Sequence, residues 1–432
     1  MNLFKLAMLT VSTAAAVAVS GCKCTELENK MLNAPWEKSK FFKKITHKTG
    51  VVSYLLTTDV SHNQQCLYFV TKEMTDDGRF LVFQLVDEED FSRDNSRIYR
   101  TIAYIDFLHD TLTVTDIRTL RGGNGAYVDP ANARIFCMSD AGLHMLDLRK
   151  GEKKSRLITP MPESVKKLGK NFRYYCTHLS MSKDNKKAFL DLQYDDSFTH
   201  GVLNVEDGTF TPWATTPFYA NHGQFNPQDP DMAMCAWEVD WVDSKGRLHH
   251  IRDHKELYYP RLWIMRSNGK RQMIPSVTNY ATHEVWAQDG KGFIFCSTNN
   301  NQGVIYHDLA TGLQRQVMTP VWLEKENRAA TASHADISSD NRYIVCDIGA
   351  GVSAGYPWRM AFGNTETGKT TIIYDDLQAY RTPEMPRTLL HPHPHPHFVF
   401  KDKVIVSTYF PELKKMQIML TPVEQLIKAN DR

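Results

Sequence analysis

The sequence predicts an all-β fold, a seven-bladed β-propeller over residues 45–432. Three observations predict it. One turn-and-strand pattern recurs seven times along the chain, a second strand follows each copy, and each repeat is about fifty residues long. That length accommodates the four short strands and turns of one propeller blade. The alternatives are a β-sandwich with accidental spacing, or a propeller of six or eight blades.

Each copy of the pattern is a turn rich in Asp, Asn or Gly that leads directly into a short apolar strand. Such turns between β-branched or aromatic runs are typical of hairpins. The turns are 46 to 61 residues apart and are centred on Gly78, Asn132, Asn185, Asp231, Gly290, Asn341 and Asp402.

The second strand of a repeat often ends in a turn with Gly, as in HMLDLRKGE at 144–152. The segment VVSYLLT at 51–57 has no turn motif of its own. We therefore expect this segment to complete the last blade and close the ring.

The N-terminus predicts export. Lys5 precedes an apolar stretch, and small residues lead to Cys22, as in a bacterial lipobox. We expect a signal peptide at 1–21, lipidation of Cys22, a tether at 22–44 and a lipid anchor at the bacterial cell envelope, in the periplasm or outer membrane. A transmembrane anchor is disfavoured because the stretch is short and contains Ser and Thr.

Composition narrows the function classes. Hydrophobic residues make up 42 % and charged residues 23 %, as in soluble globular proteins, and the net charge is +2. This charge, without a basic run, excludes nucleic acid as the expected partner. Six cysteines follow Cys24, and four of them end similar strand patterns. We therefore expect buried apolar thiols rather than disulfides.

Histidine recurs at one position of the repeat, seven residues before the turn. Repeats three to seven carry it, if two extra turn residues are allowed in the fourth; Thr71 and Gly125 stand there in the first two. The five residues are His178, His222, His283, His334 and His395. Innermost strands of a propeller run side by side along the central channel, so these side chains are expected to converge.

The seventh repeat adds a run in which four histidines alternate with prolines, from His391 to His397. Alternate residues of an extended strand share a face, so His393 and His395 are both expected to point at the axis.

A divalent metal ion would explain such a cluster. Protonated imidazoles packed together repel one another, and buried neutral ones need partners. Neutral imidazole is a common metal ligand. A single buried histidine is more often a core residue, and the alternating run alone could scavenge metal at the surface. Neither alternative explains histidines in register on five repeats.

These residues resemble the oligogalacturonate lyases, a family of seven-bladed propeller polysaccharide lyases. The resemblance extends over essentially the whole mature chain but is weak outside short patches. The patches are Ser61–Asn63 through Thr75–Arg79, Asn221–Gly223, Arg261–Trp263, Ala281–Trp286, Ser333–His334 and His393–Pro396.

The resemblance implies a manganese-type ion held by His283, His393 and His395 with a nearby glutamine, and His222 as catalytic base. We add His334 to the expected metal ligands. Two departures stand out: residue 390 is Leu where the family has glutamine, and the family's third-blade arginine is replaced near His200. The pair formed by His391 and His393 is an alternative.

The expected reaction is metal-assisted β-elimination on a uronate oligosaccharide. His222 would remove the proton α to the carboxylate. Arg261 would clamp a substrate carboxylate, or else form a salt bridge at a strand end. His62 and His178 would line the substrate site or protonate the leaving group, and Tyr259 would do the same or simply pack. An ulvan-type uronate lyase is the nearest alternative, and a non-catalytic TolB-like propeller that binds a glycan or a protein is another.

Overall fold

The computed structural model describes residues 34–57, 63–86, 99–120, 125–169, 171–195, 197–216, 220–237, 240–242, 248–250, 261–275, 281–297, 303–323, 328–330, 332–349, 358–375, 393–412 and 415–430. The predicted signal peptide, Cys22, His62, Tyr259, Leu390 and His391 lie outside these residues.

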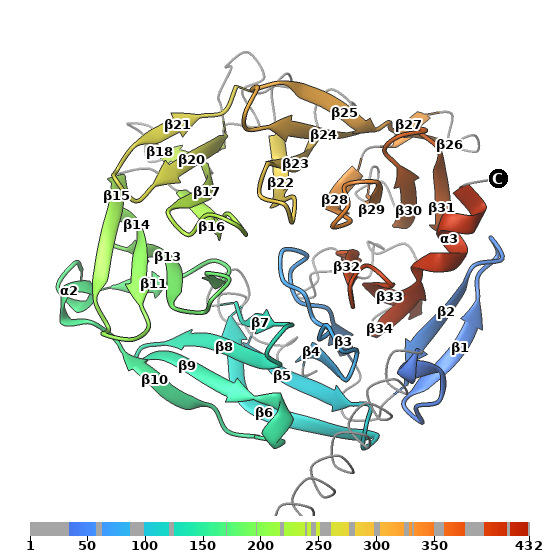
Figure 1. Cartoon of the computed structure of the whole chain (residues 1–432), viewed down its shortest axis with the longest axis horizontal. Coiled ribbons are helices and arrows are strands. Elements are labelled where there is room, and N and C mark those ends of the chain that lie inside the picture. The colour runs from blue at the N-terminus through green and yellow to red at the C-terminus, as the bar shows by residue number, and fades with distance from the viewer. Residues whose placement is uncertain are drawn as a thin grey trace, which may run out of the picture.

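Seven antiparallel sheets surround a central channel, which confirms the predicted seven-bladed propeller (Figure 1). Blade 1 consists of β3 (Asn63–Gln65), β4 (Phe80–Val86), β5 (Tyr99–Asp106) and β6 (Thr111–Leu120). Blade 2 consists of β7 (Tyr127–Asp129), β8 (Arg134–Ser139), β9 (Gly142–Asp147) and β10 (Arg156–Pro160). Blade 3 consists of β11 (Phe172–Tyr174), β12 (Ser180–Met181), β13 (Lys187–Tyr194), β14 (Ser197–Asn204) and β15 (Phe210–Thr216).

The remaining blades follow the same order from the channel outward. Blade 4 consists of β16 (Ala220–Phe225), β17 (Met232–Trp237), β20 (Leu262–Arg266) and β21 (Arg271–Met273). Blade 5 consists of β22 (Ala281–Trp286), β23 (Gly292–Ser297), β24 (Gly303–Asp308) and β25 (Gln314–Met318). Blade 6 consists of β28 (Ala332–Ile337), β29 (Tyr343–Ile348), β30 (Arg359–Asn364) and β31 (Thr370–Tyr374).

Blade 7 is built from both ends of the chain, as the unassigned strand at 51–57 predicted. Its strands are β32 (His397–Val399), β33 (Val404–Glu412), β34 (Lys415–Pro422), β2 (Val52–Leu56) and β1 (Phe42–Thr46). Tyr54 pairs with Leu420 across the closing contact. Trp36 is buried in the same core, so contact with the propeller already begins inside the segment that we expected to be tether.

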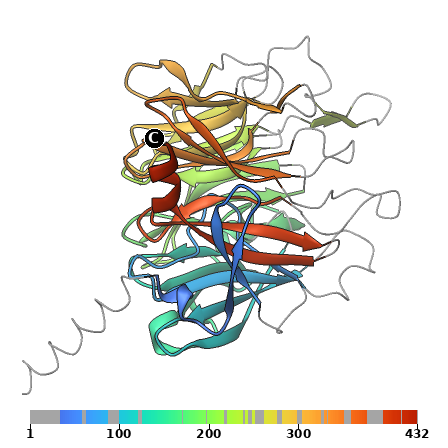
Figure 2. The ribbon, with the colours of Figure 1, turned by 90° about the vertical axis from the view of Figure 1, so that its right-hand side faces the viewer.

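Two further hairpins and four short helical segments complete the described structure. The hairpins are β18 (Asp240–Val242) with β19 (Leu248–His250), and β26 (Val321–Leu323) with β27 (Arg328–Ala330). The helices are η1 (Pro35–Glu37), η3 (Leu148–Lys150), α2 (Glu163–Lys166) and α3 (Val423–Asn430). Helix α3 packs against blade 6 at the rim (Figure 2). None of the described helices has the length and apolar character needed to cross a bilayer.

All seven repeated turns join the innermost strand of a blade to its second strand. The backbone at these turns is left-handed at Asn185, Asn341 and Asp402. Asn, Asp and Gly tolerate this conformation best, which explains the recurring composition. The turns also contact the preceding blade: Asn341 Nδ2 of blade 6 donates to Asp289 of blade 5 at 3.0 Å, and Asn185 of blade 3 donates to Asp129 of blade 2.

Blades 1 and 7 also pack closely at Gly78. Its φ is +70°, and a Cβ placed there would lie 2.6 Å from the Phe400 ring of blade 7. Only glycine combines this backbone with so close an approach.

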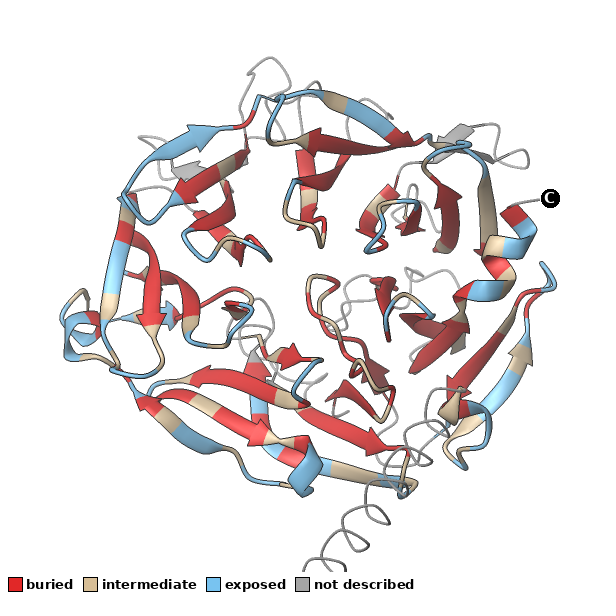
Figure 3. Ribbon diagram, in the orientation of Figure 1, coloured by how far each residue is buried: buried red, intermediate tan, exposed pale blue. Residues whose placement is uncertain are grey.

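The core lies between adjacent blades, and the outermost strands are the exposed ones (Figure 3). The six described cysteines, at positions 66, 137, 176, 235, 296 and 346, are all free and buried. This confirms that they pack as apolar residues.

Candidate functional site

The histidine register places imidazoles from five blades around the channel. His222, His283 and His395 all have left-handed backbones, with φ of 56°, 55° and 46°. His222 and His283 sit at register shifts in β16 and β22. A bulge of this kind redirects one side chain out of the regular alternation. A left-handed backbone at a non-glycine residue costs about 1–2 kcal/mol. Three such residues at the same position of the repeat therefore indicate a functional site whose strain the surrounding fold offsets.

Three of these side chains form a group suited to a metal ion. The ligand nitrogens of His334, His393 and His395 all lie within 4.8 Å of one another. Metal–imidazole bonds of roughly 2.1 Å join nitrogens up to about 4.2 Å apart, so small ring rotations bring all three to one ion. The His283 ring lies beside the group, 4.0 Å from the His334 ring.

Asp347 orients this group from β29. Its carboxylate oxygens lie 3.0 and 3.1 Å from His334 Nδ1. It also accepts the backbone N–H of His334 at 2.7 Å and of His395 at 3.2 Å. A proton on Nδ1 leaves the unprotonated Nε2 of His334 facing His393, as in carboxylate–histidine–metal arrangements. Burial raises the pKa of Asp347 to about 8, so a nearby cation would favour its ionised form.

His395 is held neutral. Burial, followed by the proximity of His393 and His283, lowers the pKa of His395 well below its ordinary value. Since a metal binds the deprotonated imidazole, the donor set fits a divalent cation.

A second group of histidines lies on blades 3 and 4. The rings of His178 and His222 are 5.3 Å apart. Burial, and then the charge of His222, lowers the pKa of His178 well below its ordinary value.

A buried ion pair between Glu284 and Arg261 lies next to His222. Glu284 Oε1 lies 3.5 Å from His222 Nδ1, and its other oxygen accepts from Arg261 at 2.5 Å. Burial alone would raise the pKa of Glu284, but the Arg261 charge and the His222 contact hold it below its ordinary value. Arg261 is only 4 % exposed and also lies 3.4 Å from His222 Nδ1. The structure thus places Arg261 in a buried salt bridge, and its expected role as a substrate clamp stays a prediction.

Asp191 plays the same part in this second group as Asp347 does in the first, because it accepts backbone N–H groups. From β13 it accepts from Thr177 N at 2.6 Å and from Gly223 N at 3.1 Å. It therefore ties the backbone beside His178 to the backbone beside His222. Burial raises the pKa of Asp191 to about 6.

The connection between β3 and β4 extends into the middle of the ring of blades (Figure 1). We call residues 66–75 the plug. The Tyr68 ring stacks on His178, with centroids 4.1 Å apart and planes 4° apart, and it lies 5.1 Å from the His395 ring. Phe69 is fully buried beside His334.

The plug is anchored to blade 7. Glu73 contacts Nε2 of the buried His397 and accepts the Leu67 N–H at 2.5 Å. Cys66 N donates to Thr408 Oγ1 at 3.1 Å. Sequence reasoning missed this element because it treated Thr71 as an innermost-strand position. The signal was the long interval between β3 and β4, with two adjacent aromatic residues in it.

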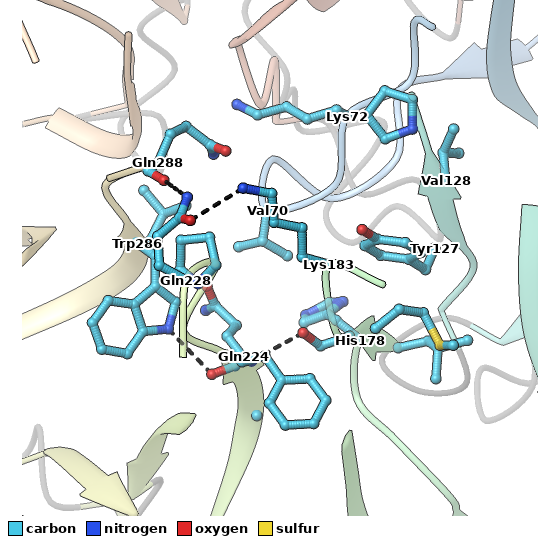
Figure 4. Close-up of a pocket in the computed structure, with 18 residues that line it drawn as sticks. Val70, Lys72, Tyr127, Val128, His178, Lys183, Gln224, Gln228, Trp286 and Gln288 are labelled. Carbon is cyan, nitrogen blue, oxygen red and sulfur yellow. Dashed lines mark hydrogen bonds between the residues drawn. The ribbon is translucent and has the colours of Figure 1, made fainter. Parts of the chain in front are cut away.

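A cavity of about 360 Å³ lies in the channel beside the plug. Val70 and Lys72 contribute the plug side, His178 forms part of another wall, and Gln228 and Gln288 come from the turns of blades 4 and 5 (Figure 4).

The predicted site residues therefore fall into three sets. The structure places Arg261 in contact with His222. It brings together six of the predicted histidines around the channel: His178, His222, His283, His334, His393 and His395. His62 and Tyr259 lie outside the described residues. The contributions of Tyr68, Glu284, Asp191 and Asp347 were not predicted.

Comparison with known proteins identifies similar folds. No family model matches the chain, and no curated protein matches it. A solved oligogalacturonate lyase in complex with manganese is 17 % identical, with a TM-score of 0.62, and the alignment covers 89 % of this chain and 97 % of that one. The oligogalacturonate lyase from Vibrio parahaemolyticus is also 17 % identical, with a TM-score of 0.64 and coverage of 88 % and 96 %.

TolB from Acinetobacter baumannii aligns over 80 % of both chains at 12 % identity, with a TM-score of only 0.39. The resemblance to oligogalacturonate lyases that the sequence predicted is thus confirmed at the level of the fold, a seven-bladed propeller like theirs.

Proposed function

We propose that this protein is a metal-dependent lyase that cleaves uronate-containing oligosaccharides of the oligogalacturonate type by β-elimination. One observation carries the proposal: a metal-type histidine group and a carboxylate-supported histidine both lie against the Tyr68 ring in the channel. The similarity in fold to oligogalacturonate lyases, one of them solved with manganese, supports it.

His334, His393 and His395, with His283 beside them, would hold the divalent cation, for which manganese is the first choice. When bound, the cation would neutralise a substrate carboxylate and the negative charge that develops there as the α proton leaves. The neutral state of His395 and the orientation of His334 by Asp347 prepare the group for this role.

His222 is the proposed base. The proposal requires the tautomer in which Nδ1 carries the proton and directs it at the Glu284 carboxylate, instead of accepting from Arg261. Nε2 can then accept a proton. It takes the proton from the carbon α to the carboxylate. A double bond then forms to the neighbouring carbon, the bond to the linking oxygen breaks, and that oxygen takes up a proton as it leaves.

The other predicted residues surround this reaction. His178 remains neutral because burial lowers its pKa, so we assign it to lining the site rather than to supplying the proton. Substrate contacts by His62 and Tyr259, and the carboxylate clamp by Arg261, belong to the proposal. Arg261 also holds Glu284 in place and so acts on His222 as a positioning residue.

Export completes the proposal. A signal peptide at 1–21 and lipidation of Cys22 would place the enzyme at the bacterial cell envelope, where oligosaccharides arrive from outside. Labelling with a radioactive fatty acid tests this, since incorporation should disappear in Cys22→Ala.

A product assay tests the activity. The purified protein is incubated with oligogalacturonates and, separately, with ulvan fragments, with Mn²⁺ or with chelator, and the absorbance of the unsaturated product is followed. We expect product from oligogalacturonates that chelator abolishes and Mn²⁺ restores. Product from ulvan alone would establish the ulvan-type alternative. No product from any uronate with any metal would favour a non-catalytic binder.

A further inference from the structure

We propose that Tyr68 partitions the histidine ring, holding His178 and His222 out of reach of the metal ligands so that one imidazole stays free to take a proton. This inference rests on the proposed function and names a positioning residue for it.

The ring contacts divide the histidines into two groups. On blades 5 to 7, the His334 ring lies 4.0 Å from His283 and 4.3 Å from His395. On blades 3 and 4, His178 lies 5.3 Å from His222. Among the described residues, no direct ring contact joins one group to the other.

The Tyr68 ring contacts histidines of both groups. It stacks on His178 at 4.1 Å and lies 5.9 Å from His222. It also makes T-shaped contacts with the His395 ring at 5.1 Å and with the His334 ring at 6.2 Å. The phenol ring thus contacts rings of both groups, and in the proposal it fills the space that His178 or His222 would need to enter to join the metal ligands.

A partition is chemically necessary here. Neutral imidazole is a good ligand for many divalent cations, and a cation near five or six such rings gains by binding more of them. An imidazole bound to a cation through its lone pair cannot accept a proton. The buried, neutral His178 would otherwise be an available ligand.

Tyr68 is held firmly enough to do this. The plug turn closes with a hydrogen bond of 2.9 Å from Thr71 N to Tyr68 O. The contacts of Cys66 and Glu73 with blade 7 fix the segment before and after Tyr68. Val70, two residues further on, lines the cavity of about 360 Å³ and supplies a matched control in the same segment.

The test compares Tyr68→Ala, Tyr68→Phe and Val70→Ala in the full chain. Each protein is freed of metal and titrated with Co²⁺, whose visible spectrum reports ligand number and geometry. We expect Tyr68→Phe and Val70→Ala to keep the wild-type spectrum. We expect Tyr68→Ala to shift it and to bind Co²⁺ at least tenfold more tightly. With Mn²⁺ in the product assay, the same variant should lose at least about 100-fold in activity, because its base is sequestered.

Two double variants identify the recruited imidazole. Adding His222→Ala or His178→Ala to Tyr68→Ala should restore the wild-type spectrum in one of the two cases. If Tyr68→Ala fails to fold, as judged by its thermal melt, Tyr68→Leu fills more of the space without a ring and takes its place.

The outcomes separate this inference from the proposed function. A wild-type protein that binds no Co²⁺ would overturn both. If Co²⁺ binds and Tyr68→Ala leaves the spectrum and affinity unchanged, the partition is refuted and the metal site stands. If Tyr68→Ala shifts the spectrum but the wild-type protein has no lyase activity, the partition is supported and the proposed enzyme activity is refuted.

Discussion

Replacing Asp347 by Asn should weaken metal binding while leaving the fold intact. The carboxylate accepts from His334 Nδ1 and from the backbone N–H groups of His334 and His395. Asparagine has the same shape but only one acceptor oxygen, and its amide group would direct N–H bonds at other donors. At least one of the three contacts is therefore lost, and the His334 tautomer is no longer fixed.

The size of the effect follows from two arguments that agree. A hydrogen bond to a charged group contributes about 1.5–3 kcal/mol, which corresponds to a change of about 10- to 100-fold in the dissociation constant. Removing the partner of a metal-binding histidine typically costs roughly 10- to 100-fold in metal affinity. We expect the Mn²⁺ dissociation constant of Asp347→Asn to rise within this range.

The assay is calorimetric titration of metal-free protein with Mn²⁺. Asp191→Asn is the matched control, because Asp191 is also a buried aspartate that accepts backbone N–H groups from two neighbouring blades. It supports the blade 3 and 4 histidines and should leave the Mn²⁺ affinity unchanged. Equal affinities for wild type and Asp347→Asn, or equal losses in both variants, would refute this reasoning.

Three more predictions address the base, the buried ion pair and the ring closure. His222→Ala should lose about 10²- to 10⁴-fold in lyase activity with an unchanged Mn²⁺ content; an active variant would remove His222 as base. Glu284→Gln leaves the buried Arg261 without its counter-charge and should cost about 3–5 kcal/mol in unfolding free energy. The folded-state pKa of Glu284 is lowered. The ion pair therefore stabilises the fold at neutral pH, and this stabilisation is lost as the pH falls below the ordinary glutamate value near 4.5. If urea titrations show that the unfolding free energies of wild type and Glu284→Gln do not converge in acid, the ion pair is contradicted. Leu56→Ala, at a fully buried position of the closing strand β2, should cost about 2–5 kcal/mol without changing the Mn²⁺ affinity, and a change below 1 kcal/mol in the same titration would show that β2 does not close the ring.

The repeats and the histidine register were predictable because both follow from local chemistry. Turn residues such as Asn185 and Asn341 must tolerate a left-handed backbone, and this restricts residue type at a fixed interval. Once the interval is known, residues at the same position of each repeat, such as His283 and His334, are expected to lie near the axis. The closing role of 51–57 followed from counting strands.

The groups around the histidines were not predictable in the same way. Asp347 lies in the apolar run YIVCDI, where a buried carboxylate signals a special partner without identifying it. The ion pair of Arg261 with Glu284 joins residues from two blades, and sequence alone could not decide between this salt bridge and a substrate clamp. Tyr68 escaped notice because an insertion in the first repeat carries the chain into the channel and breaks the register that the other repeats keep.

The central claim is that imidazoles from separate blades hold one cation beside His222. Anomalous diffraction from crystals grown with Mn²⁺ tests it directly. We predict a single strong peak within bonding distance of His334, His393 and His395. A peak elsewhere, or none at these three residues while Mn²⁺ supports activity in solution, would contradict the account.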